Sequence, residues 1–127
     1  MHKILKNNDR VFLLPSLDYF AFSLLLNICT LILTDSGGIQ EEAPALKKPV
    51  FVLRDSCERS EVIRCGGGKL VGTNRSEIFS SVSHILNNPA EYEKMANSGS
   101  PYGDGLASKR IVQSLFNYFA CYQKEAS

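Results

Sequence analysis

The 127-residue sequence is 44% hydrophobic and 21% charged, and its 14 basic residues nearly balance its 13 acidic residues, giving a net charge of +1. This balance excludes a general nucleic-acid binder and a polybasic membrane-surface binder, because both need a clear excess of Lys and Arg. The ordinary apolar content excludes a disordered chain. Length and composition therefore predict one domain over residues 1–127 with an ordinary hydrophobic core.

The four cysteines form no CxxC pair, and no histidine stands at a metal-ligand spacing from them. We therefore expect no metal site, and scattered thiols of this kind are typical of a reducing, cytoplasmic compartment. The most apolar stretch, residues 11–33, is interrupted by Pro15, Asp18 and Asn27. We expect no membrane span, because an aspartate is costly inside a bilayer.

Short apolar runs alternate with helical patterns in the first half of the chain. Pro15 ends the first run, and Ser16 is placed to cap the helix that follows. Pro44 lies inside the second helical pattern, so we expect that helix to bend or to become irregular there. In chain order we predict a strand at 11–14, a helix at 16–28, a strand at 31–34, a helix at 39–46 and a strand at 49–53.

The second half of the chain continues the alternation with one more strand and then helices. Three glycines at 66–68 predict a turn, and Asn74 is placed to cap a helix. In chain order we predict a strand at 69–71, a helix at 75–86, a helix that begins at 88–89, a loop at 100–105 and a last helix at 107–122. The apolar residues of the last helix that we expect to face inward are Ile111, Val112, Leu115, Phe116 and Phe119.

This alternation predicts βαβ units and hence an α/β fold, a Rossmann-like parallel sheet of about four strands flanked by helices. Open parallel sheets usually carry five or six strands. The sequence therefore indicates a partial sheet that belongs to a larger domain.

The turn between the second predicted strand and its helix is the strongest ligand-binding motif of the sequence. Gly37 and Gly38 would let a ligand approach the backbone, where free N–H groups and the helix dipole favour a phosphate. Ligands of parallel sheets lie at such carboxyl ends. The sequence has neither a P-loop nor a GxGxxG fingerprint, and on spacing alone a tight turn without a ligand is an equal alternative.

Charged residues near this turn add a second element to the motif. Glu42 follows Gly38 by four residues, so it lies on the same helix face and could accept hydrogen bonds from sugar hydroxyls. The alternative is that Glu41 and Glu42 are a solvated acidic pair that complements the helix dipole. Beyond the next strand, an arginine of the segment 54–59 could neutralise a phosphate, or the segment could be only a surface salt-bridge loop.

These motifs together resemble the C-terminal part of the bacterial non-hydrolysing UDP-N-acetylglucosamine 2-epimerases over about residues 10–115. The longest matching stretch is Thr-Asp-Ser-Gly-Gly-Ile-Gln-Glu-Glu-Ala-Pro-Ala-Leu at 34–46. The other matching stretches are 48–50, 52–55, Glu58 with Arg59, Glu61, 69–73, 101–105 and 107–108.

The resemblance implies a GT-B-type fold with two Rossmann-like domains, of which the C-terminal one binds UDP. It implies that Ser36, Gly37 and Gly38 bind the diphosphate, and that Glu42 binds the ribose hydroxyls. It further implies that Arg59 contacts the phosphate side of the nucleotide, and that Leu17 and Phe22 contact the uracil.

The activity implied by the resemblance is that of an isomerase of polysaccharide biosynthesis. Such an enzyme interconverts UDP-GlcNAc and UDP-ManNAc by eliminating UDP and adding it back, without a metal or other cofactor. The catalytic carboxylates of the family belong to the N-terminal domain, so we expect no catalytic residue in these 127 residues. The implied partners are UDP or a UDP-N-acetylhexosamine, and a complementary N-terminal fragment or a second copy of the chain.

The sequence departs from the family pattern at three positions. Lys47 stands where the family has a glycine, and we expect a positive φ there at a cost of about 1 kcal/mol. Ser60 replaces a proline, and Gly67 replaces a threonine.

The resemblance covers only the C-terminal part of the family's pattern, so this chain is expected to be inactive alone. The alternatives are a non-catalytic UDP- or UDP-sugar-binding module and an inactive remnant.

Overall fold

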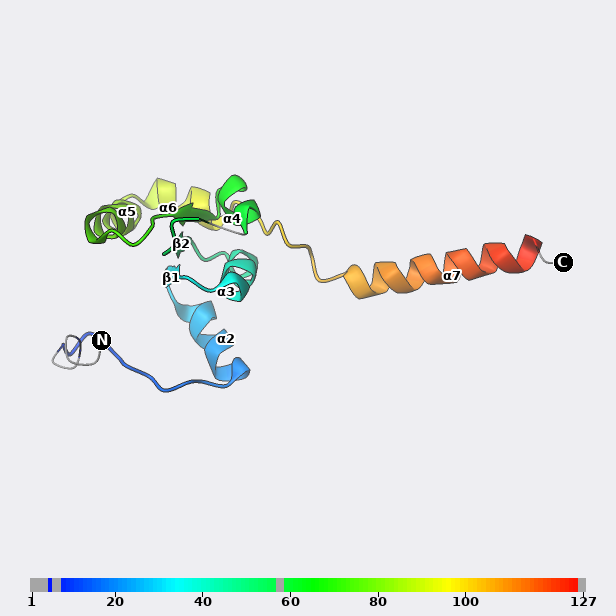
Figure 1. The fold of residues 1–127 in the computed structure, drawn as a ribbon, viewed down its shortest axis with the longest axis horizontal. Helices are drawn as coiled ribbons and strands as arrows, with labels where there is room; N and C mark the ends of the chain where they lie inside the picture. The colour runs from blue at the N-terminus through cyan, green and yellow to red at the C-terminus, as the bar shows by residue number, and fades with distance from the viewer. Residues whose placement is uncertain (1–4, 6–7, 57–58, 126–127) are drawn as a thin grey trace.

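The computed structural model describes residues 5, 8–56 and 59–125. Its strands are β1 (Ile32–Thr34), β2 (Val50–Val52) and β3 (Gly68–Leu70). Its helices are α2 (Tyr19–Ile28), α3 (Gly37–Glu42), the 3-10 helix η1 (Ala43–Leu46), α4 (Ser60–Arg64), α5 (Arg75–Asn87), α6 (Pro89–Ala96) and α7 (Ala107–Glu125). Figure 1 shows α5 and α6 on one side of the sheet and α2 and α3 on the other.

The three strands form a parallel sheet in the order β1-β2-β3, with Ile32 opposite Val50 and Val50 opposite Gly68. All three residues of β2 are buried, because helices cover both faces of a parallel sheet. Val50 and Val52 pack with Leu26 and Ile32 on the α2 and α3 face. Phe51 points to the opposite face, where the second core cluster includes Val71, Ile85 and Met95. The predicted parallel α/β architecture is confirmed, with three strands in the described residues.

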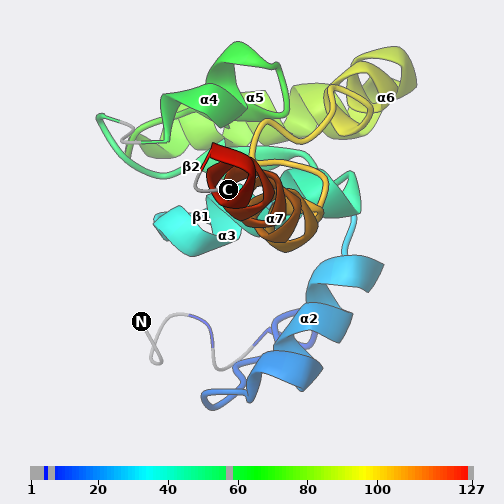
Figure 2. The same ribbon diagram turned by 90° about the vertical axis from the view of Figure 1, so that its right-hand side faces the viewer.

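The strand predicted at 11–14 is wrong for the structure described here. Residues 11–18 belong to no helix or strand, and Phe12 is 82% exposed. A strand is stable only when a neighbour pairs its backbone, and this segment has no neighbouring strand among the described residues. Figures 1 and 2 show the segment beyond α2, away from the sheet.

The N-cap of α2 lies two residues after the predicted one. The helix begins at Tyr19, and the carboxylate of Asp18, rather than the hydroxyl of Ser16, accepts a hydrogen bond from the Ala21 N–H at 2.8 Å. An N-cap side chain reaches the N–H two or three residues later, so the residue directly before the helix provides the cap. The cap predicted for α5 is confirmed, since the side chain of Asn74 accepts hydrogen bonds from Ser76 and Glu77.

The helix predicted at 39–46 is regular only in its first part. The α-helical residues end at Glu42, and Pro44 lies in the 3-10 helix η1, so the predicted irregularity at Pro44 is confirmed. Lys47 ends η1 with φ 56° and ψ 40°. This left-handed conformation is the one expected from the resemblance, in which a glycine occupies the position of Lys47.

Replacing Lys47 with glycine is therefore expected to stabilise the protein by about 1 kcal/mol, because glycine adopts a positive φ without steric cost. The midpoint of urea unfolding, followed by circular dichroism, measures the change. Lys48→Gly is the matched control, since Lys47 is the one non-glycine residue with a positive φ in the described part of the chain. Lys48→Gly should destabilise the fold slightly, and equal stabilisation by both variants would contradict the explanation.

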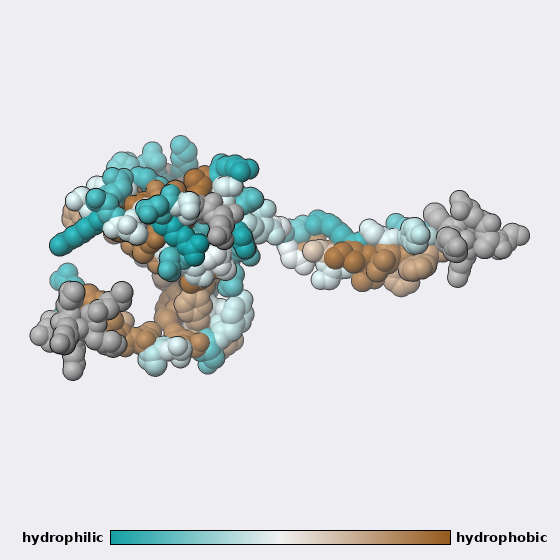
Figure 3. All heavy atoms as spheres, viewed as in Figure 1, coloured by the Kyte–Doolittle hydropathy of each residue, from teal (hydrophilic) through white to brown (hydrophobic). Residues whose placement is uncertain are grey.

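Helix α7 extends away from the sheet and its covering helices, as Figures 1 and 2 show. The five residues predicted to face inward are exposed instead, for example Phe116 at 69%. The predicted helix with one apolar face is confirmed, and Figure 3 shows apolar residues along one side of α7. No described element covers this face. The prediction that this stripe is buried is wrong for the described structure.

The loop before α7 is attached to the helix through Asp104. Its carboxylate accepts hydrogen bonds from the Leu106 N–H and from both terminal nitrogens of Arg110, at 2.9 and 2.7 Å. The Arg110 guanidinium lowers the pKa of the Asp104 carboxyl, and the Leu106 N–H adds to this effect. Loop residue Asp104 is thus tied to the first turn of α7.

None of the described helices is both long and apolar enough to cross a membrane.

Candidate functional site

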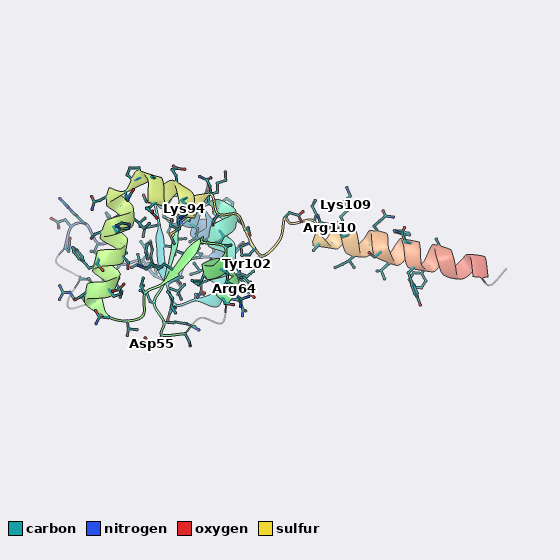
Figure 4. All side chains as sticks on the ribbon, turned by 90° about the horizontal axis from the view of Figure 1, so that it is seen from above. Asp55, Arg64, Lys94, Tyr102, Lys109 and Arg110 are labelled. Atoms are coloured by element: carbon teal, nitrogen blue, oxygen red, sulfur yellow. The ribbon has the colours of Figure 1, made fainter. Side chains whose placement is uncertain are left out.

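The candidate site lies at the edge of the sheet where β1 and β2 end. Parallel strands end at the same edge, so the residues after Thr34 and those after Val52 meet there. Figure 4, seen from above, labels Asp55 in the loop that follows β2. This edge is where the sequence predicted a ligand.

The turn between β1 and α3 is formed by Ser36, Gly37 and Gly38. The hydroxyl of Thr34 accepts a hydrogen bond from the Ser36 N–H at 3.0 Å, which fixes the chain as it leaves the strand. Apart from its chain neighbours and the backbone of its own helix, a Cβ atom added at Gly37 or Gly38 would have no described atom within 4 Å. The space beside this turn is therefore open, and the small residues leave room for a ligand to reach the backbone.

Two neighbouring carboxylates on α3 contact different parts of the protein. The Glu41 carboxylate forms an ion pair with Nε of Arg59, which comes from the loop after β2. The Glu42 carboxylate accepts a hydrogen bond from the Tyr19 hydroxyl of α2 at 3.4 Å. Each glutamate therefore has a protein partner, which argues against the alternative of a merely solvated acidic pair.

Arg59 is held at its side chain and at its backbone. Its side chain contacts Glu41, and its carbonyl oxygen accepts a hydrogen bond from the Tyr102 hydroxyl at 3.5 Å. Figure 4 shows Tyr102 near α4, to which Arg59 is the N-terminal cap residue. Glu58, which the sequence placed beside Arg59, lies outside the described residues.

The Glu41–Arg59 ion pair contributes little to folding. The two side chains are 41% and 43% exposed, so solvent screens the interaction, and such pairs typically contribute about 1 kcal/mol or less.

The two residues predicted to contact uracil lie at the beginning of α2. Phe22 is half-buried and packs against the core cluster of Leu26 and Ile32, and Leu17 is exposed just before the helix. Tyr19, between them in sequence, lines a cavity of about 240 Å³ together with Ser23, Glu42, Ala45 and Leu46. The roles of Phe22 and Leu17 stay predictions.

The sequence analysis did not predict the contact of Tyr19 with Glu42 or the contact of Glu41 with Arg59. The signal that could have indicated Tyr19 was an aromatic residue in the first turn of the helix, two residues after Leu17. For Glu41, the spacing of four residues from Gly37 was equivalent to the spacing of Glu42 from Gly38.

The described residues include no group of three or more His, Cys, Asp or Glu side chains that could hold a metal ion.

Among the cysteines, Cys29 is partly buried, and burial raises the pKa of its thiol more than nearby Lys48 lowers it. A raised pKa makes a thiol a poorer nucleophile at neutral pH. The groups of the site that could contact an anionic ligand are the N–H groups of the turn, the Ser36 hydroxyl and the Arg59 guanidinium.

Fold and site together define a Rossmann-like α/β unit with a ligand-binding turn at the carboxyl edge of its sheet. The family model described as UDP-N-acetylglucosamine 2-epimerase matches residues 1–116. The chain belongs to this family.

Similar proteins include a UDP-N-acetylglucosamine 2-epimerase of Bacillus subtilis, 46% identical over 124 residues that cover 98% of this chain and 32% of the relative. A Staphylococcus aureus protein, MnaA in a co-structure with UDP, superimposes with a TM-score of 0.86 at 41% identity, covering 94% of this chain and 33% of that one. The Neisseria meningitidis UDP-GlcNAc 2-epimerase bound to UDP-GlcNAc gives a TM-score of 0.85 at 46% identity, covering 91% and 31%. The chain thus spans about a third of the length of the relatives it matches.

Proposed function

We propose that this chain is the UDP-binding part of an isomerase that interconverts UDP-GlcNAc and UDP-ManNAc. The observation that carries the proposal is the contact between the two segments that follow β1 and β2 at one edge of the sheet: the Glu41–Arg59 ion pair joins the segment of the Ser36–Gly38 turn and Glu42 to the segment of Arg59. The UDP and UDP-GlcNAc in the structures of the Staphylococcus and Neisseria relatives support it.

In this proposal each part of the nucleotide has its own protein groups. The hydroxyl of Ser36 and the backbone N–H groups of Gly37 and Gly38 bind the diphosphate, and the Arg59 guanidinium offsets its charge. The Glu42 carboxylate, which Tyr19 contacts, accepts hydrogen bonds from the ribose hydroxyls. Leu17 and Phe22, at the beginning of α2, contact the uracil.

The chemical contribution of these residues is to stabilise UDP as a leaving group and as the returning nucleophile. Elimination places negative charge on the departing diphosphate, and preorganised donors and a guanidinium stabilise that charge. The acid and base that act at C2 of the sugar belong to the remaining two-thirds of the relatives' length. No step of this proposal uses a metal or a nicotinamide.

We further infer that residues 1–127 form a single partial domain whose exposed apolar surfaces are covered by that remaining part of an epimerase. Beside β1, Leu33 is 42% exposed and lines an open groove of about 540 Å³ with Ile78, Phe79, Val82 and Leu86. Val112, Leu115, Phe116 and Phe119 of α7 form a second apolar surface. The remainder of an epimerase is the occupant because the relatives are about three times as long as this chain.

Calorimetric titration of the chain with UDP tests the binding proposal. We expect a dissociation constant in the micromolar to millimolar range and no epimerisation by the chain alone. The double variant Ser36→Ala/Glu42→Ala should bind at least about tenfold more weakly, because it loses hydrogen bonds to charged groups.

The matched control is Ser80→Ala/Glu91→Ala, which removes the same groups from exposed positions on α5 and α6 and should bind UDP like the original chain. A chain that is folded by circular dichroism but gives no heat with UDP would contradict the proposal. UDP binding without turnover, even in the presence of the rest of an epimerase, would favour a non-catalytic UDP-binding module instead.

A further inference from the structure

The contact between Glu41 and Arg59 links the two segments that form the candidate site, one after β1 and one after β2. Glu41 belongs to α3, after β1, and Arg59 precedes α4, after β2. We propose that Glu41 is a positioning residue that holds the Arg59 guanidinium in place for the phosphate groups of a nucleoside diphosphate. The inference rests on the proposed function and adds to it a residue that does not itself touch the ligand.

The position of Glu41 on α3 places this contact beside the ligand-binding turn. Glu41 follows Gly37 by four residues, so the two lie on the same face of the helix. Side chains of a helix lean toward its N-terminus, so the Glu41 carboxylate is directed toward the turn. Arg59 contacts that carboxylate, so its guanidinium lies beside α3, the helix that begins at the turn.

Holding the guanidinium before the ligand arrives favours binding. Arginine recognises phosphate through a planar group with a fixed arrangement of donors, so its orientation decides whether two parallel hydrogen bonds form. An unrestrained arginine must lose side-chain freedom when the ligand binds. In this protein Glu41 fixes the side chain at Nε, and Tyr102 contacts the backbone carbonyl of the same residue.

Stability of the fold is a poor explanation for the ion pair, because both side chains are about two-fifths exposed. Glu41 also cannot attract the ligand directly, since its negative charge repels a diphosphate. Removing that charge should strengthen UDP binding if Glu41 only neutralises Arg59, and should weaken it if Glu41 positions Arg59. The direction of the change therefore distinguishes the two roles.

The experiment compares Glu41→Gln, Arg59→Lys and the double variant by titrating the full chain with UDP and with uridine. We expect Glu41→Gln to weaken UDP binding about tenfold and to leave uridine binding unchanged. Arg59→Lys keeps the positive charge but lacks Nε, so in that background Glu41→Gln should change UDP affinity less than about twofold. Glu61→Gln, which removes one exposed carboxylate from the first turn of α4, is the matched control and should leave UDP affinity unchanged.

Circular dichroism establishes that each variant is folded before its affinity is interpreted. Unchanged or tighter UDP binding by Glu41→Gln would overturn the inference, as would an equal loss of UDP and uridine binding or an equal effect of Glu61→Gln. Additive losses in the double variant would overturn it as well. Absence of UDP binding by the original chain would instead overturn the proposed function, and the inference with it.

Discussion

Replacing Phe51 with alanine is expected to lower the free energy of unfolding by about 3–5 kcal/mol. Phe51 is fully buried at the centre of the middle strand and packs against Val71, Ile85 and Met95. Alanine would leave a cavity between the sheet and the layer of α5 and α6, because tightly packed surroundings relax only partly. Urea unfolding followed by circular dichroism measures the change.

Phe79→Ala is the matched control, because it removes the same side chain from a position that is 73% exposed. Its effect on the chain alone should stay within about 0.5 kcal/mol. Phe51→Leu, expected to cost about 1 kcal/mol, keeps the comparison measurable if the alanine variant does not fold. Similar losses from Phe51→Ala and Phe79→Ala would contradict the placement of the core.

Adding the part of the Bacillus subtilis epimerase that this chain does not match is expected to produce epimerase activity. We expect conversion of UDP-GlcNAc to UDP-ManNAc at a rate at least about a hundredfold above that of either part alone, because acid–base catalysis at C2 then acts on bound UDP-sugar. Nuclear magnetic resonance of the sugar's anomeric proton distinguishes the two epimers. Size-exclusion chromatography of the mixture measures the complex directly.

The variant Leu33→Lys/Phe79→Lys tests whether the groove beside β1 is the contact surface. Both side chains are exposed in the chain alone, so its fold should be preserved, whereas two lysines in the groove should prevent the complex and the activity. Ser36→Ala/Glu42→Ala is the complementary control, which should form the complex but lose activity. A complex that tolerates both lysines would contradict the proposed surface.

Most of the sheet could be predicted from the sequence because its signals are local. Strands β1 and β2 are continuous apolar runs bounded by turn residues, which is the pattern of strands in a parallel sheet; β2 is buried throughout, and β1 is buried at Ile32 and Thr34. The cap at Asn74 and the irregular helix at Pro44 depend on a few adjacent residues. Such features are encoded within one or two helical turns of sequence.

The wrong predictions concern residues whose burial depends on distant partners. Residues 11–14 and the apolar stripe of α7 have sequences suited to burial, but burial needs a second surface that the described residues do not provide. Similarly, the sequence predicted that Glu42 and Arg59 lie at one edge of the sheet. It did not predict that Glu41 contacts Arg59 or that Tyr19 contacts Glu42, because those contacts depend on how separate loops and helices pack.

Gly103 lies between a residue attached to the body of the protein and a residue attached to α7. On one side, the Tyr102 hydroxyl donates a hydrogen bond to the Arg59 carbonyl in the body of the protein. On the other side, the Asp104 carboxylate accepts hydrogen bonds from Leu106 and Arg110, which attach it to the helix. Gly103, with φ 110°, has a backbone conformation that other residues rarely adopt. Rotation about the two backbone bonds of Gly103 would change the direction of α7 without breaking the hydrogen bonds of Tyr102 or Asp104.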